Sequence, residues 1–159
     1  MHQKRTTPLP FGFTLIEILV VIGMIAVLAG IVLTAINPLR QFALARNAQR
    51  ASDVNAILNA IGQRIAENQG VFTDASDCIR PLPNTSTDIS SSAFDLRTCL
   101  VPSYISELPI DPSAGTLSGA TYDSGYTVTQ ASSTGRITIC APNAAESAIV
   151  DSQPYCLTR

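Results

Sequence analysis

Glu17 is the residue whose type and position most strongly suggest chemistry in this sequence. It is the only charged residue within positions 13–36, a run of 24 residues, and residues 18–39 carry no charge at all. An ionisable group in an apolar membrane segment costs about 2.5–3.5 kcal/mol on insertion scales, and it indicates function when a partner can be named. Cleavage between Gly12 and Phe13 would create that partner, because Phe13 would then carry a free α-amino group. The Phe13 amine is the partner that such a cleavage would supply to the Glu17 carboxylate.

Catalytic chemistry of the common kinds has few residues to use here. The single histidine is His2 and the single lysine is Lys4, which disfavours imidazole acid–base catalysis in the rest of the chain. The sequence has no G-x-S-x-G element, no glycine-rich phosphate loop and no cluster of residues at metal-ligand spacing. We predict that the chain is not an enzyme.

The charge balance also argues against nucleic acid as a partner. The 159 residues have a formal net charge of −2, with 14% charged and 46% hydrophobic residues. Residues 71–159 contain nine Asp and Glu against four Arg, and an acidic surface does not attract phosphate backbones.

The apolar run over residues 13–36 is long enough to cross a membrane as a helix, which takes about 20 apolar residues. Lys4 and Arg5 precede it, so the positive-inside tendency places the N-terminus in the cytoplasm and the rest of the chain outside. A cleaved secretory signal would have a shorter apolar core of about 7–15 residues followed by a small-residue cleavage site. A plain signal anchor would fit the run but would not explain Glu17.

Four cysteines lie in the second half of the chain at wide spacings. Without a C-x-x-C pair or partner histidines, they favour disulfides and an oxidising compartment over zinc. Three connectivities are possible, and pairing of nearest neighbours would close two loops, each stabilising by about 3 kcal/mol in the chain-entropy model. That pairing joins Cys78 to Cys99 and Cys140 to Cys156.

The hexapeptide G-F-T-L-I-E at residues 12–17 follows a short basic leader and precedes I-L-V-V-I-G-M-I-A-V-L-A. This stretch resembles the class III signal of type IV prepilins and type II secretion pseudopilins. The resemblance implies that a prepilin peptidase removes residues 1–12 and methylates the Phe13 amine. It further implies that inner-membrane assembly machinery moves the subunit from the membrane into a helical filament of copies of itself, outside the cell or in the periplasm.

A physical reason for Glu17 follows from that expected assembly. In a core of packed apolar helices, the carboxylate would pair with the Phe13 amine of a neighbouring copy, and an unpaired buried charge would be strongly penalised. Apolar surfaces can slide along one another, whereas one buried ion pair is satisfied at a single stagger. The pair would therefore set the register between subunits.

The segment over residues 13–69 is predicted to be a long N-terminal helix with an apolar part (13–36) and an amphipathic part (39–68). Gly30 and Pro38 indicate a kink or local melting between them, or alternatively Gly30 serves close helix packing. In the amphipathic part, one face carries apolar residues at helical spacing: Val54, Ile57, Leu58, Ile61 and Ile65. We expect the arginines of this part to lie on solvated faces or against acidic neighbours in a filament: Arg40, Arg46, Arg50 and Arg64.

Residues 70–159 are predicted to form an extracytoplasmic head. We expect a loop over 81–92, a serine-capped helix over 92–101, and a hairpin of strands 125–130 and 136–140. The predicted fold class is α+β and pilin-like: a long helix packed on a small antiparallel sheet with two disulfides.

A second resemblance lies in the head. The L-P-I-D-P element at residues 108–112 looks like a loop of major pseudopilins, some of which bind calcium beside it. Asp111 and Asp123 are the candidate oxygen ligands, although Asp111 could instead cap the backbone amides of a turn. A Cys140–Cys156 loop would resemble the C-terminal disulfide loop of many type IV pilins. The head therefore combines a feature of type IV pilins with a feature of type II secretion pseudopilins.

Three functions remain open from the sequence. The first is a structural subunit of a type IV pilus (fimbrium), with a type II secretion pseudopilin as its alternative. The second is a minor, initiating or tip subunit of the same machine. The third is a membrane-anchored binding module that does not polymerise.

Overall fold

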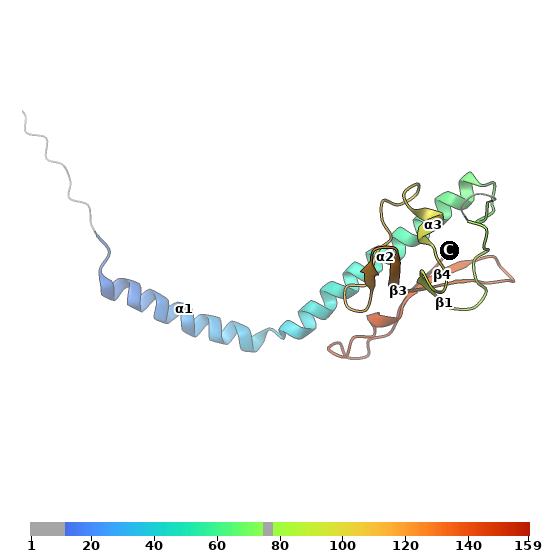
Figure 1. The fold of residues 1–159 in the computed structure, drawn as a ribbon. Coiled ribbons are helices and arrows are strands. Elements are labelled where there is room, and N and C mark those ends of the chain that lie inside the picture. Colours follow the sequence, from blue (N-terminus) through green and yellow to red (C-terminus); the bar gives the residue numbers. More distant parts are fainter. Residues whose placement is uncertain (1–11, 75–77) are drawn as a thin grey trace, which may run out of the picture. The chain divides into compact units, whose positions relative to one another are not determined.

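The computed structural model describes residues 12–74 and 78–159, so residues 1–11 of the predicted leader lie outside the described part. Two long helices come first, α1 (Leu15–Ala35) and α2 (Pro38–Glu67). The chain divides into two compact units after Pro38, and α2 belongs with the head (Figure 1). The predicted head at 70–159 is thus extended by a helix that shares its core.

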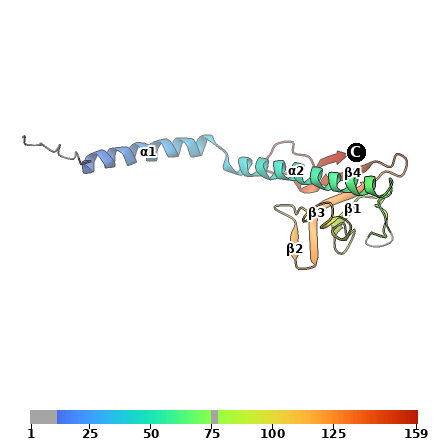
Figure 2. The ribbon, with the colours of Figure 1, turned by 90° about the horizontal axis from the view of Figure 1, so that it is seen from above.

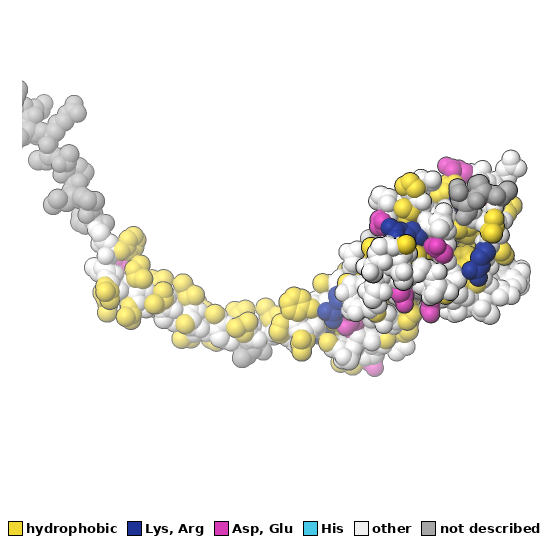
Figure 3. Space-filling model, viewed as in Figure 1, with side chains coloured by type: hydrophobic (Ala, Val, Ile, Leu, Met, Phe, Trp, Pro, Cys, Tyr) yellow, Lys and Arg dark blue, Asp and Glu magenta, His cyan; other side chains and the backbone are white. Residues whose placement is uncertain are grey.

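The first unit contains α1, a helix of 21 residues. At 1.5 Å rise per residue it measures about 31 Å, which matches the hydrocarbon thickness of a bilayer. Residues Leu15–Leu33 are apolar enough to cross a membrane, and none of that window is buried within the chain. Figure 3 shows hydrophobic side chains along this whole helix.

The break between the helices lies at Ile36 and Asn37, directly before Pro38. Proline is favoured at the first position of a helix because it has no N–H to leave unpaired there. Gly30 lies inside α1, so the interruption expected between Gly30 and Pro38 falls at its proline end. The helix predicted over 13–69 is present in two segments.

The face of α2 that the sequence marked as apolar packs against the sheet. Val54, Ile57 and Ile61 are fully buried, Leu58 is nearly so, and Ile65 packs at the edge of the same core. Figures 1 and 2 show the helix running beside the strands. The predicted packing stripe is confirmed.

The sheet is antiparallel, with strand order β1-β3-β4-β5, and β2 also pairs with β3. The strands span β1 (Thr87–Ser90), β2 (Thr116–Ser118), β3 (Thr121–Gln130), β4 (Ile137–Ala141) and β5 (Tyr155–Thr158). Alternate residues of β3 and β4 are buried, as expected of strands with one face on a core. The predicted hairpin is confirmed as β3 and β4.

Two local predictions in the head are wrong. The segment over 81–92 is not all loop, because it contains β1. The helix expected over 92–101 is only the short α3 (Arg97–Leu100), and no serine caps it. The Asp95 carboxylate accepts from the Arg97 and Thr98 amides instead, at 3.0 and 3.5 Å, so the turn begins later than Ser92 suggested.

Two disulfides close the head, Cys78–Cys99 and Cys140–Cys156. The second joins directly paired residues of β4 and β5. The predicted α+β class is confirmed, and an apolar N-terminal helix followed by an antiparallel sheet with disulfides is a pilin-like architecture.

Candidate functional site

Glu17 lies in the first turn of α1, next to the residue that caps this helix. Thr14 caps the helix, and its hydroxyl accepts from the Glu17 amide at 3.3 Å. A Ser or Thr cap with Glu three residues later is the spacing of a capping box, and the helix dipole favours a carboxylate there. Both features place a negative charge at the start of the apolar helix.

The expected processing residues directly precede this helix. Gly12 and Phe13 lie outside any helix or strand, and Phe13 is 80% exposed. A peptide bond that is exposed and outside regular secondary structure is accessible to a peptidase. The roles predicted for Gly12, Phe13 and Glu17 in processing and assembly stay predictions.

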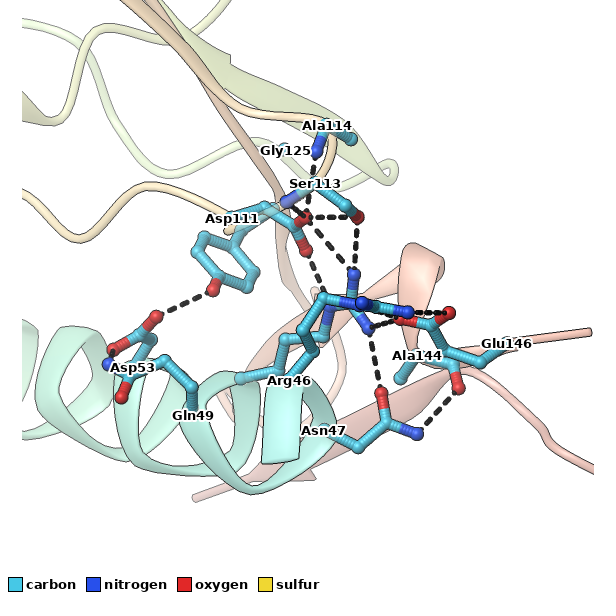
Figure 4. Close-up of polar contacts among 12 residues, drawn as sticks. Arg46, Asn47, Gln49, Asp53, Asp111, Ser113, Ala114, Gly125, Ala144 and Glu146 are labelled. Atoms are coloured by element: carbon cyan, nitrogen blue, oxygen red, sulfur yellow. Dashed lines mark hydrogen bonds and ion pairs between the residues drawn. The ribbon is translucent and has the colours of Figure 1, made fainter. Parts of the chain in front are cut away.

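The head contains a buried ion pair between α2 and the loop before β2. The Arg50 Nε donates to Asp111 Oδ2 at 2.7 Å, and its second terminal nitrogen donates to Oδ1 at 3.2 Å. Figure 4 shows Asp111 among these polar contacts, beside Ser113. The Arg50 and Asp111 side chains have no solvent-exposed surface. Burial of two charges costs free energy, which this two-point contact and further hydrogen bonds offset.

The C-terminal loop joins the same cluster through Glu146. Its carboxylate accepts from Arg46 at 2.7 and 2.8 Å and from Arg50 at 2.7 Å. Asn47 also donates to the Ala144 carbonyl at 2.9 Å. The first half of α2 is thereby tied to the loop that follows β4.

Asp111 also shapes its own turn. It accepts from the Ser113 and Ala114 amides, each at 2.9 Å, so the predicted capping of a turn is confirmed. Burial by itself raises the pKa of this carboxyl, but hydrogen bonds from Arg50 and these amides lower it to about 2. Asp111 is therefore an anion whose cation is supplied by α2.

The second calcium candidate, Asp123, is exposed and accepts from the Gly125 amide at 2.9 Å. Within the described ranges 12–74 and 78–159, no three His, Cys, Asp or Glu side chains gather as a metal site would require. A calcium role for Asp111 and Asp123 stays a prediction, and Arg50 occupies the Asp111 oxygens in this structure.

A further buried contact links α2 to the sheet. The Tyr126 hydroxyl of β3 donates to the Asp53 carboxylate at 2.8 Å, and Gln49 donates to its other oxygen at 2.7 Å. Burial and the neighbouring carboxylate both raise the pKa of Tyr126. The phenol therefore stays protonated and serves as a fixed donor.

The burial of two arginines of α2 differs from the expectation drawn from the sequence. Arg50 and Arg64 are 0% and 4% exposed, although both were expected on solvated faces or at filament contacts. Arg64 donates to the carbonyls of Phe72 and Cys99 at 2.8 and 2.6 Å. Their spacing in the sequence could have predicted this burial. Arg50 precedes Val54 by four residues, so it lies on the apolar face of the helix.

Comparison of the chain with family models, with curated proteins and with solved structures gives no match. The evidence for the architecture and for the candidate sites therefore comes from the residues of this chain alone. The apolar helix α1 is suited to a membrane anchor or a signal, and the two disulfides indicate that the head lies outside the cytoplasm.

Proposed function

We propose that this chain is the structural subunit of a type IV pilus-like filament. It is cleaved after Gly12, held in the membrane by α1, and then polymerised through that helix. The Glu17 carboxylate of one copy pairs with the Phe13 amine of its neighbour. The observation that carries the proposal is a single acid in the first turn of a 21-residue apolar helix. Among the residues that the structure describes, none of the window Leu15–Leu33 of this helix is buried.

The exposed surface of α1 supports two successive environments. Lipid covers its apolar side chains while the subunit is stored, and helices of other copies cover them after assembly. Lipid gives no partner to a carboxylate, whereas a neighbouring cleaved N-terminus does. Glu17 thus favours the assembled state and selects one stagger within it.

Two features of the head favour a pilus over a secretion pseudopilus. The Cys140–Cys156 bridge resembles the C-terminal disulfide loop of type IV pilins. Asp111, which resembles a residue near the calcium site of some pseudopilin heads, is neutralised by Arg50. These features support the assignment of the pilus as the first candidate.

The test uses the full chain expressed with its own secretion machinery, and it compares Glu17→Gln and Glu17→Ala. Glutamine keeps the capping-box position and removes the charge, so a loss shared by both variants reports the charge alone. We expect wild-type protein in the sheared surface fraction with an intact mass that begins at methylated Phe13, and a loss of at least tenfold in both variants. Glu107→Gln, an exposed carboxyl of the head, is the matched control and should leave the yield unchanged.

Two results would contradict the proposal. Protein that retains residues 1–12 and stays in the membrane fraction would indicate a signal-anchored module. A correctly cleaved chain that is sheared in equal amounts from wild type and Glu17→Gln would show that the carboxylate is not needed for assembly.

A further inference from the structure

The head has an apolar groove beside the second half of α2. Its apolar lining is formed by Leu58, Gly62 and Ala66 of the helix and Ile137 of β4. Its polar lining is formed by Asn59, Gln63 and Arg159, and the Arg159 guanidinium donates to the Asn59 side-chain oxygen. The groove has a volume of about 510 Å³. Gly62 helps to keep it open, because a Cβ placed there would meet nothing within 4 Å.

The same head has an unusually exposed aliphatic side chain elsewhere. Val150, in the loop between β4 and β5, is 87% exposed, the largest fraction among the large apolar residues described in residues 39–159. The next residue, Asp151, is also exposed and has a φ of +57°. Ile79 is the next most exposed apolar residue at 74%, but it is followed by Arg80, which would repel Arg159.

In this structure the loop does not line the groove of its own copy. Glu146 holds the loop to Arg46 and Arg50, whereas the groove begins at Leu58 and is centred near Gly62. Twelve residues of helix separate Arg50 from Gly62, which corresponds to about 18 Å along the axis. Figure 2 shows the C-terminal end of the chain beside the second half of α2, whereas the loop bonds to its first half.

We propose that Val150 and Asp151 of one copy dock in this groove on a second copy. Val150 buries its side chain against Leu58 and Ile137, and Asp151 pairs with Arg159. The apolar part of the lining and the Arg159 guanidinium, whose hydrogen-bond partner Asn59 is uncharged, together match an aliphatic side chain with an acidic neighbour. The contact rests on the proposed filament function and names a head-to-head interface within it.

The positions of the loop and the groove also determine what kind of assembly this contact forms. The loop and the groove are different surfaces of the same head, so the contact is heterologous. A docked pair keeps one free groove on the first copy and one free loop on the second. Such a contact continues from copy to copy, unlike the self-complementary patch of a closed dimer. It therefore adds to a filament held by α1.

Charge exchange between the two sides tests the pairing in the full chain. We expect Asp151→Arg and Arg159→Asp each to lower the sheared filament yield at least fivefold, and the double variant to restore most of it. Arg136→Asp, an exposed arginine of the same head that does not line the groove, is the matched control. Intact mass with and without reduction checks that both disulfides have formed in every variant.

A photo-crosslinking amino acid at Val150 provides a second readout that does not depend on yield. We expect a dimer band whose linked peptide contains residues 58–66 or Ile137. Normal yields in both single variants, or crosslinks to other peptides or other proteins, would overturn the contact while wild-type filaments leave the proposed function standing. Wild-type chain that forms no filament would overturn the proposed function and this contact with it.

Discussion

Arg50 and Asp111 form an ion pair from which water is fully excluded, across 61 positions of sequence. The Nε–Oδ2 distance is 2.7 Å and neither side chain has exposed surface. Arg50 also donates to Ser113 at 2.6 Å and to Asn47 at 2.8 Å, so its charge is surrounded by acceptors. This cluster fixes the loop at residues 111–114 against α2, and it makes the head depend on one guanidinium.

Removal of one partner of the Arg50–Asp111 pair should destabilise the folded head. We expect Arg50→Met to lower the free energy of unfolding by about 3–5 kcal/mol, because it leaves the Asp111 carboxylate buried without a cation. The double variant Arg50→Met, Asp111→Leu should recover part of that loss. Urea unfolding of the full chain in detergent measures both.

The matched control for that measurement is Arg46→Ala. Arg46 contacts the same cluster through Glu146, but its side chain is 35% exposed, so the expected loss is below about 1 kcal/mol. Equal losses for Arg46→Ala and Arg50→Met would contradict the assignment of the buried pair as the dominant contact.

The same cluster predicts how stability depends on pH. The pKa of Asp111 falls from 3.8 to about 2, and that of Glu146 from 4.5 to about 2 through its bonds to Arg46 and Arg50. Because the unfolded chain binds these protons first, stability is fully present above about pH 4.5 and is lost as the pH falls toward 2. For Asp111 the loss is on the order of 2 kcal/mol.

Thermal melts of the full chain between pH 5 and pH 2 measure this slope. Glu146→Gln should flatten the slope, whereas Asp88→Asn, which alters an exposed carboxyl on β1, should leave it unchanged. A melting temperature that rises as the pH falls would reverse the expected sign and contradict the ion-pair account.

Two glycines of similar backbone conformation provide a test of packing at the Asp111 turn. Gly125 and Gly135 have φ values of +74° and +69°, so alanine is strained at either position. A Cβ at Gly125 would lie 2.7 Å from the Asp111 Cβ, whereas one at Gly135 would meet nothing within 4 Å. We expect Gly135→Ala to cost about 1 kcal/mol and Gly125→Ala about 1–3 kcal/mol more. Equal losses in chemical denaturation would show that the turn can move away from β3.

Much of this fold is predictable from local patterns in the sequence. The spacing of Val54, Ile57 and Ile61 predicts the buried face of α2, and the alternation around Tyr126 and Ile139 predicts the hairpin. The Thr14 cap with Glu17 three residues later also lies within one helical turn. Each of these features depends on residues close together in the chain.

The long-range contacts were not predictable in the same way. In the sequence, Arg50 is typical of a charged helix residue and Asp111 of a turn residue. Only the tertiary fold brings the two side chains together. Ser92 is a reasonable helix cap by type, but the Asp95 carboxylate competes for the same role nearer to α3. The predicted Glu17 to Phe13 contact joins two copies, so a single chain does not contain it.

The two disulfides should differ in their accessibility to a reductant. Cys78 and Cys99 are 2% and 6% exposed, whereas Cys156 is exposed at the sheet edge and Cys140 is half-buried. Thiol–disulfide exchange requires access of a thiolate to one sulfur, so mild dithiothreitol should open Cys140–Cys156 first in the native full chain. Differential alkylation and peptide mass mapping measure the order.

A Cys140→Ser, Cys156→Ser variant should release no thiol under the same treatment, and its free energy of unfolding should fall by about 3 kcal/mol from the lost loop closure. Prior release of Cys78 and Cys99 would mean that the head opens around its core before its edge.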